Sequence, residues 1–102
     1  MNFLNEAQAY EGEMRAFFED LHRHPEPSHF ETRTNRRVRE QLKAHGIDML
    51  CPKDNITIAV IHGAKPGKTV GLRFDTDALQ LQELCDVPYK SELDGLMHGC
   101  GH

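Results

Sequence analysis

The sequence predicts a small α/β fold in which two amphipathic helices precede a β-hairpin. Apolar residues recur at steps of three and four over residues 2–22, which is the period of a helix that buries one face. A similar spacing continues from Phe30 to Leu42 and predicts a second helix. The pattern then changes to two short segments rich in strand-forming residues, 56–61 and 69–74, which predict the two strands of a hairpin.

Local signals indicate where the helices begin and end. The first helix is expected to end just before Pro25, because proline disfavours helical geometry in the preceding residue. Ser28 and Glu31 have the spacing of a capping box, so the second helix is expected to begin there and run to about His45. Gly46 then supplies a left-handed terminator. Two helices and one hairpin leave sheet edges exposed, so the fold is expected to be an incomplete domain.

The composition limits the class of protein. The 102 residues allow one small domain or a piece of a larger one, and 38% hydrophobic with 27% charged residues is an ordinary globular balance. No apolar run approaches the roughly 18 residues that span a bilayer, so no membrane partner is expected. A net charge of −4 argues against nucleic acid as a partner, and the arginines within residues 33–39 are expected to form a solvated helix face.

Cysteine usage indicates the cellular compartment. Cys51, Cys85 and Cys100 are too few, and odd in number, for a disulfide framework. The first residues also lack the basic and apolar segments of a secretory signal, so a cytoplasmic location is expected. Cys51 and Cys85 have no local partner residues and are expected to be small buried hydrophobic side chains.

The densest chemical cluster is the C-terminal run His98-Gly99-Cys100-Gly101-His102. Thiolate and imidazole are preferred ligands of zinc and related ions, and glycines let a backbone fold closely around a small object. In an extended loop, Cys100 and His102 point to the same side. The run alone cannot complete a tetrahedral site, so further ligands would lie elsewhere. A flexible tail with incidental His and Cys is the alternative interpretation.

Two carboxylates follow the second predicted strand. If that strand continues, Asp75 and Asp77 point to the same side, where a carboxylate could bind a metal or orient a metal ligand. A polar strand terminus is the plainer interpretation. His22 and His24 lie two residues apart at the end of the first helix, and they are expected to interact with the helix dipole rather than to bind metal.

Five segments in sequence order carry a resemblance to a known family: residues 21–26, 66–70, 72–79, 88–91 and 97–102. Together they resemble the M20 metallopeptidase family in its amidohydrolase branch, which includes hippurate hydrolases and N-acyl-amino-acid amidohydrolases. The resemblance covers nearly the whole chain and implies an N-terminal fragment. It also implies a zinc-exopeptidase-like catalytic domain, a helix-flanked α/β sheet. Residues 1–102 would be the N-terminal portion of that domain, with the lid or dimerisation domain absent.

The resemblance further implies a site for two divalent metal ions. Cys100 and His102 correspond to metal ligands, and Asp77 to a carboxylate that supports the metal site. Asp75 and His98 are expected near that site. The ions would be Zn, Mn, Co or Ni, since mixed sulfur, nitrogen and oxygen ligands suit all of them. Such a pair lowers the pKa of a bridging water and polarises the substrate carbonyl.

The expected function is metal-dependent hydrolysis of the amide bond of N-acyl amino acids or small peptides. The full-length protein would be an amidohydrolase that acts on a small-molecule substrate. It would form a homodimer. The 102 residues alone are expected to be inactive, because the family's glutamate base and remaining ligands lie further along the chain. The alternative is a small non-enzymatic metal-binding or interaction module that functions as it stands.

Overall fold

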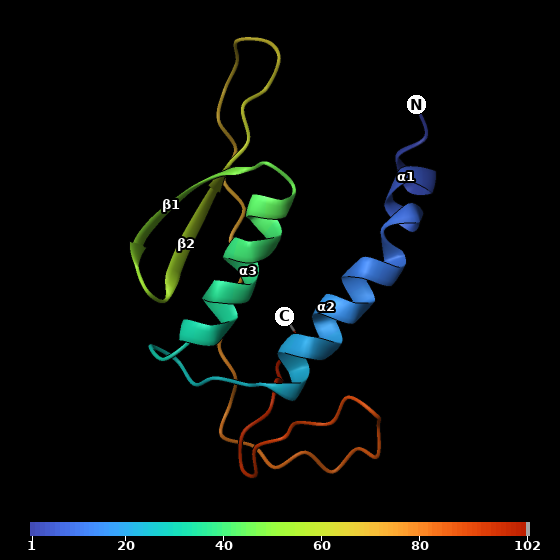
Figure 1. Cartoon of the computed structure of the whole chain (residues 1–102), viewed down its shortest axis with the longest axis vertical. Coiled ribbons are helices and arrows are strands. Elements are labelled where there is room, and N and C mark those ends of the chain that lie inside the picture. The colour runs from blue at the N-terminus through green and yellow to red at the C-terminus, as the bar shows by residue number, and fades with distance from the viewer. Residues whose placement is uncertain (102) are drawn as a thin grey trace. The chain divides into compact units, whose positions relative to one another are not determined.

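The structure is a computed structural model and describes residues 1–101. It contains three helices and one two-stranded antiparallel sheet (Figure 1): α1, Phe3–Ala9; α2, Glu11–Arg23; α3, Thr32–Ala44; β1, Asp48–Lys53; and β2, Ile56–Val60. The chain divides into two compact units. Residues 1–25 and 78–101 form the terminal unit, and residues 26–77 form the hairpin unit. Within residues 1–101, none of the helices is both long and apolar enough to cross a membrane.

The first helical segment is interrupted at Tyr10, so the prediction of one continuous helix over residues 2–22 is wrong in this detail. The Tyr10 amide donates to the Ala7 carbonyl at 3.1 Å, which makes a turn tighter than that of an α-helix. The Tyr10 carbonyl then accepts from the Met14 amide at 2.9 Å and begins α2. As predicted, α2 ends before Pro25.

The start of α3 is capped by Glu26, and not by Ser28 as the capping-box spacing predicted. The Glu26 carboxylate accepts hydrogen bonds from the amides of Arg33, at 3.0 Å, and of Thr34. These are two of the amides that a helix leaves without a partner. Glu31 accepts instead from the amide two residues before it, at 2.7 Å. A carboxylate with two oxygens serves two helix amides at once, which a single serine hydroxyl cannot do.

The end of α3 confirms the predicted glycine terminator. Gly46 has a φ of 66°, in the left-handed region that favours glycine. Its amide donates to the Lys43 carbonyl at 3.0 Å, and the Ile47 amide donates to the Leu42 carbonyl at 2.9 Å. These two bonds form a Schellman motif, which satisfies the last carbonyls of the helix and turns the chain into β1.

The hairpin of the structure uses only one of the two predicted strands. The predicted strand over residues 56–61 is confirmed as β2. Its partner is β1, which pairs with it antiparallel so that Asp48 lies opposite Val60 and Leu50 opposite Ile58. The fold class, helices followed by a hairpin, is therefore confirmed, with the hairpin shifted towards the N-terminus.

The shift of the hairpin has a physical cause in each segment. β1 contains Pro52, which has no amide to donate, and the pairing register is irregular between Leu50 and Lys53. Because of Pro52 and its polar residues, β1 lacks the run of strand-forming residues that predicts a strand from sequence. Residues 69–74 have the composition of a strand but form none, because a strand also needs a hydrogen-bonded neighbour. Their alternate apolar side chains are exposed, with Phe74 at 78%.

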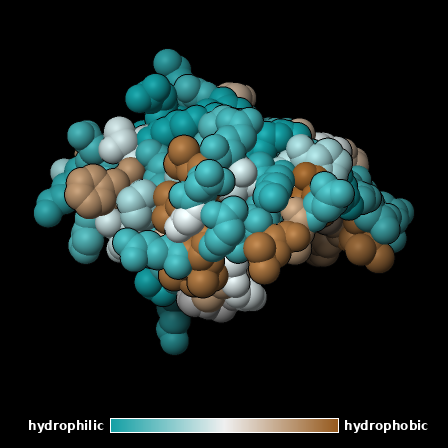
Figure 2. Space-filling model, turned by 90° about the horizontal axis from the view of Figure 1, so that it is seen from below, coloured by the Kyte–Doolittle hydropathy of each residue, from teal (hydrophilic) through white to brown (hydrophobic). Residues whose placement is uncertain are grey.

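Much of the apolar side-chain surface of the chain is exposed. Figure 2 shows hydrophobic patches between hydrophilic residues on one face. Ala78 and Pro25 are buried apolar residues. The buried polar or charged side chains are His22, Glu31, Thr34, Asn35 and Glu83. The prediction that Cys51 and Cys85 are buried is wrong, because an irregular hairpin strand and a loop leave them without a covering layer.

Candidate functional site

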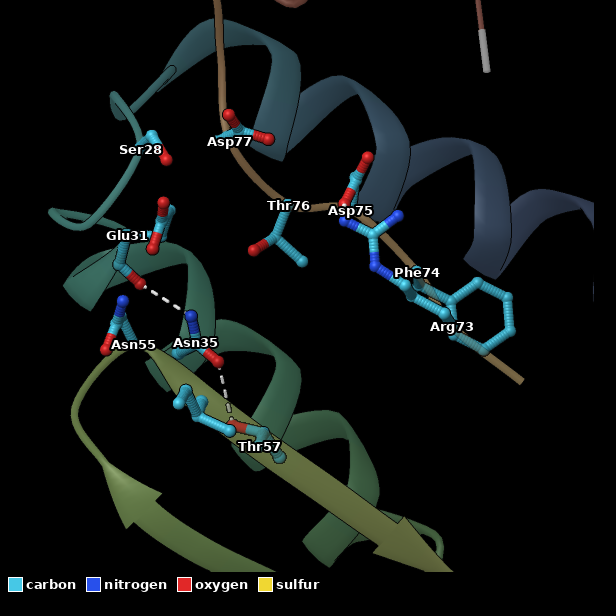
Figure 3. Close-up of a pocket in the computed structure, with 11 residues that line it drawn as sticks. Ser28, Glu31, Asn35, Asn55, Thr57, Arg73, Phe74, Asp75, Thr76 and Asp77 are labelled. Atoms are coloured by element: carbon cyan, nitrogen blue, oxygen red, sulfur yellow. Dashed lines mark hydrogen bonds and ion pairs between the residues drawn. The ribbon is translucent and has the colours of Figure 1, made fainter. Parts of the chain in front are cut away.

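The hairpin unit contains a polar cavity of about 450 Å³ at the end of the segment that was predicted as a strand. Figure 3 shows its lining residues, with Asp77 on the side of Ser28 and Glu31, and Asp75 beside Arg73. The full lining consists of Ser28, Glu31, Asn35, Asn55, Ile56, Thr57, Arg73, Phe74, Asp75, Thr76 and Asp77. Asp75 and Asp77 thus line one cavity, with a third carboxylate from Glu31.

A chain of hydrogen bonds fixes one wall of this cavity. Asn35, which is 3% exposed, donates from Nδ2 to the Glu31 carbonyl at 2.8 Å. Its Oδ1 accepts from the Thr57 hydroxyl at 2.9 Å (Figure 3). Thr57 Oγ1 in turn accepts from Arg39 Nε at 2.9 Å. The wall therefore joins the first turns of α3 to β2 with oriented polar groups.

The opposite side of the cavity carries opposing charges. The guanidinium of Arg73 lies 2.5 Å from the Asp75 carboxylate, so this pair neutralises itself. Asp77 is half-buried and keeps a carboxylate at the cavity. Carboxylate oxygens are ligands for hard divalent cations, and they can also orient a neighbouring group by hydrogen bonding.

The terminal unit contains a buried histidine–carboxylate pair. His22, at the end of α2, is 8% exposed, and Glu83 is 3% exposed. His22 Nε2 lies 2.7 Å from Glu83 Oε1, and Glu83 Oε2 accepts from the Ser91 amide at 2.6 Å. The hydrogen bond from Ser91, followed by the one with His22, holds the pKa of Glu83 below its usual range despite the opposing effect of burial.

Two aromatic rings pack against His22. The Tyr89 ring meets His22 edge-on at a centroid distance of 5.6 Å, and Phe18 lies 5.9 Å from both rings. His24, which follows α2 as its C-cap residue, lies 3.2 Å from the Glu92 carboxylate through Nε2. His22 thus contacts a carboxylate of a distant loop, which the prediction of a helix-dipole interaction did not anticipate. His24 confirms that prediction, because its Nδ1 lies 2.8 Å from the Asp20 carbonyl in the last turn of α2.

The run predicted to bind metal follows in the same unit. His98 is half-buried, and its ring centroid lies 6.3 Å from that of His22. Cys100 is exposed. His102 lies outside the described residues. Within residues 1–101, no three His, Cys, Asp or Glu side chains converge in an arrangement that could hold a metal ion.

The donor types nevertheless fit a divalent metal. Cys100 supplies a sulfur at an exposed position between two glycines, and the run also contains imidazole nitrogens. These residues can provide part of a coordination set. Any complete site needs donors besides those that residues 1–101 bring together.

Sequence reasoning missed Glu83 as a structural centre. The signal was a single carboxylate among the leucines of residues 79–84, with no other charge in that stretch. Such a residue is costly to bury without partners, so a buried position predicts a specific hydrogen-bonding role. Its partners Ser91 and His22 lie too far along the chain for any local pattern to reveal them.

Comparison with known proteins gives the family. No family model matches the chain. The chain is 43% identical over 84 residues to thermostable carboxypeptidase 2 of Saccharolobus solfataricus, covering 80% of this chain and 21% of that protein. It is 35% identical over 104 residues to the hippurate hydrolase of Campylobacter jejuni, covering 100% of this chain and 27% of that protein.

A solved structure decides the assignment. The chain superposes on Bacillus subtilis YxeP, a dinuclear metal-binding peptidase from the M20 family, with a TM-score of 0.86 and 36% identity. The superposition covers 92% of this chain and 27% of YxeP. The chain belongs to the M20 family. This M20 chain spans about a fifth to a quarter of the length of these relatives, which are hydrolases or peptidases by name.

Proposed function

We propose that the whole protein containing this chain hydrolyses the amide bond of N-acyl amino acids or small peptides with divalent metal ions. The observation that carries the proposal is the His-Gly-Cys-Gly-His run, in a chain that superposes on a dinuclear metal-binding peptidase. The relatives' names support the substrate class, since hippurate is an N-acyl amino acid and a carboxypeptidase cleaves a peptide bond.

In this proposal Cys100 and His102 bind metal, and Asp77 supports the metal site. Asp75 and His98 lie near the site without contacting the metal. The bound ions, up to two per site and drawn from Zn, Mn, Co and Ni, would activate water and polarise the scissile carbonyl. Cys100 contributes its thiolate, since the thiol must lose its proton to bind.

The chain would form the N-terminal portion of the catalytic domain, with the lid or dimerisation domain outside it. The whole protein would then act as a cytoplasmic homodimer. Residues 1–102 by themselves would be inactive, since they bring together no complete set of metal ligands within residues 1–101.

The test uses the protein as its gene encodes it, with any residues that follow His102. The protein is reloaded with manganese or zinc, and hydrolysis is followed on N-acetyl and N-benzoyl amino acids and on dipeptides. Cys100→Ala and His102→Ala should each reduce turnover at least about 100-fold, as loss of a metal ligand does. Cys85→Ala, at an exposed cysteine outside the run, is the matched control and should keep full turnover.

Full turnover in the Cys100→Ala, His102→Ala double variant would contradict the proposal. Tight stoichiometric zinc binding coupled to folding, with no hydrolysis of any of these substrates, would instead favour the non-enzymatic metal-binding module.

A further inference from the structure

The loop that leads to Cys100 is tied to α2 through one buried side chain. Glu83 uses both carboxylate oxygens, one towards His22 and the other to accept from the Ser91 amide. The carboxylate therefore joins α2 to both the start and the middle of the loop over residues 83–97. The same loop also contacts the end of α2 through its backbone, since the Glu92 amide donates to the Arg23 carbonyl at 2.9 Å.

Ser91 also forms hydrogen bonds with residues further along the loop. Its hydroxyl donates to the Leu96 carbonyl at 2.7 Å and accepts from the Leu93 amide at 3.2 Å. The Gln82 side-chain oxygen accepts from the Gly95 amide at 2.7 Å. Side chains on both flanks of the loop thus satisfy backbone groups that have no helix or strand to pair with.

The loop closes directly before the metal-binding run. Leu79 and Met97 form an antiparallel bridge, with amide-to-carbonyl distances of 2.9 and 3.0 Å. Two residues later, a Cβ built on Gly99 would lie 2.8 Å from Leu81 Cδ1. The backbone at Gly99 therefore packs closely against the Leu81 side chain. Any larger residue at position 99 would have to displace that side chain.

We propose that Glu83 is a positioning residue for Cys100. Through His22, Ser91 and the Leu79–Met97 bridge, it holds residues 98–101 in the conformation that presents the Cys100 sulfur to a metal ion. This inference rests on the proposed function, because it gives Cys100 the role of a ligand.

The energetics of a buried charge favour positioning over stabilisation. A buried ion pair gains little net stability, since desolvation of both groups offsets their attraction. Apolar residues at the positions of Glu83 and His22 would enclose as much surface. They could not, however, fix the Ser91 amide or select one loop conformation. Because His22 is 8% exposed and Glu83 3% exposed, water has little access to compete for the hydrogen bond between them.

The first test needs no metal. In the 102-residue chain, Glu83→Gln keeps the side-chain shape but leaves one acceptor oxygen for two donors. Hydrogen exchange of the Met97 amide, which donates to Leu79, should become about tenfold faster, the equivalent of one lost hydrogen bond. Asp94→Asn, at an exposed position on the same loop, is the matched control and should leave Met97 exchange unchanged. Unchanged exchange in Glu83→Gln would overturn the proposal.

The second test measures binding of cobalt(II) alone, followed by its thiolate charge-transfer absorption. Glu83→Gln should weaken cobalt affinity by about tenfold, and the control Asp94→Asn should not. Ser91→Ala, which keeps the Glu83–His22 pair, guards against loss of fold and should give a smaller weakening in the same direction. Equal cobalt affinity in wild type, Glu83→Gln and Ser91→Ala would overturn the positioning role.

The two tests separate this inference from the proposed function. If Cys100→Ser leaves the charge-transfer band of the wild-type chain unchanged, the ligand role of Cys100 fails and the positioning proposal fails with it. If the band depends on Cys100 but not on Glu83, the proposed function stands and only the positioning proposal is overturned.

Discussion

The hairpin unit and the terminal unit are each stabilised internally by different kinds of contact. The hairpin unit relies on backbone ladders between β1 and β2 and on helix ends satisfied by Glu26 and Gly46. In the terminal unit, the loop over residues 83–97 relies on side chains that reach far along the sequence, with Glu83 and His22 61 positions apart. Regular structure can therefore be encoded locally, whereas this irregular loop depends on a few long-range polar contacts.

Arg39 shows that the hairpin unit also uses side chains, but differently. Its guanidinium donates to the carbonyls of Lys53, at 2.6 Å, and Ile56, at 3.0 Å, around the hairpin turn. Both acceptors lie within the adjacent hairpin. The Arg39 side chain therefore reinforces a hairpin that backbone hydrogen bonds already form. Glu83 instead orders a loop that has no backbone ladder of its own.

The largest effect is expected for Tyr89→Ala in the terminal unit. The variant removes the ring that contacts both His22 and Phe18, and the half-buried site should lose about 2 kcal/mol of unfolding free energy. Tyr89→Phe keeps the ring and should lie close to wild type. Chemical denaturation monitored by residue-resolved NMR measures both, and equal losses in the two variants would refute the packing role of the ring.

A smaller effect is expected for Arg39→Ala in the hairpin unit. Loss of the bonds to the hairpin carbonyls and to Thr57 should cost about 1.5 kcal/mol, because water replaces part of the exposed interactions. Arg36→Ala, at an exposed position on the same helix, is the control and should change stability by less than about 0.5 kcal/mol. Denaturation followed at the β2 amides is the measurement. Comparable losses in the two variants would show that Arg39 does not hold the turn.

The next effect distinguishes the two candidate caps of α3. Glu26→Ala should destabilise the helix by about 1 kcal/mol, since two amides lose their acceptor. Ser28→Ala should have almost no effect, because Ser28 does not cap the helix. The same denaturation experiment decides between them. A larger loss in Ser28→Ala would restore the capping box that the sequence pattern predicted.

The smallest expected effect is a pH dependence of the terminal unit. The pKa of Glu83 is lowered in the folded chain, so its contribution to stability is complete above the usual glutamate range. That contribution is lost as the pH falls below this range and through the lowered pKa. Hydrogen exchange of the Ser91 amide should therefore lose protection on acidification before the amides of β2 do. Simultaneous loss in both units would contradict the assignment.

The elements of the hairpin unit that the sequence predicted correctly are those with local signals. Gly46 and the strand over residues 56–61 are visible locally, because conformational preference and β-branching act within a few residues. The errors arose where the residue that determines the structure lies outside the pattern used for the prediction. Glu26 displaced Ser28 as the cap, and Pro52 concealed β1.

The candidate site was predictable in chemistry but not in its support. Cys100, His98, Asp75 and Asp77 are recognisable by residue type and spacing, and the structure places the two aspartates at one cavity. The role of Glu83 could not be predicted, since nothing near it in sequence shows that His22 and Ser91 meet its two oxygens.

The most direct test of the central claim is X-ray absorption spectroscopy at the zinc edge of the zinc-loaded protein. We expect one sulfur neighbour of the metal at about 2.3 Å, together with nitrogen or oxygen neighbours. That sulfur should disappear in Cys100→Ser and remain in Cys85→Ser. A wild-type spectrum with nitrogen and oxygen neighbours alone would contradict the claim that this run binds the metal through Cys100.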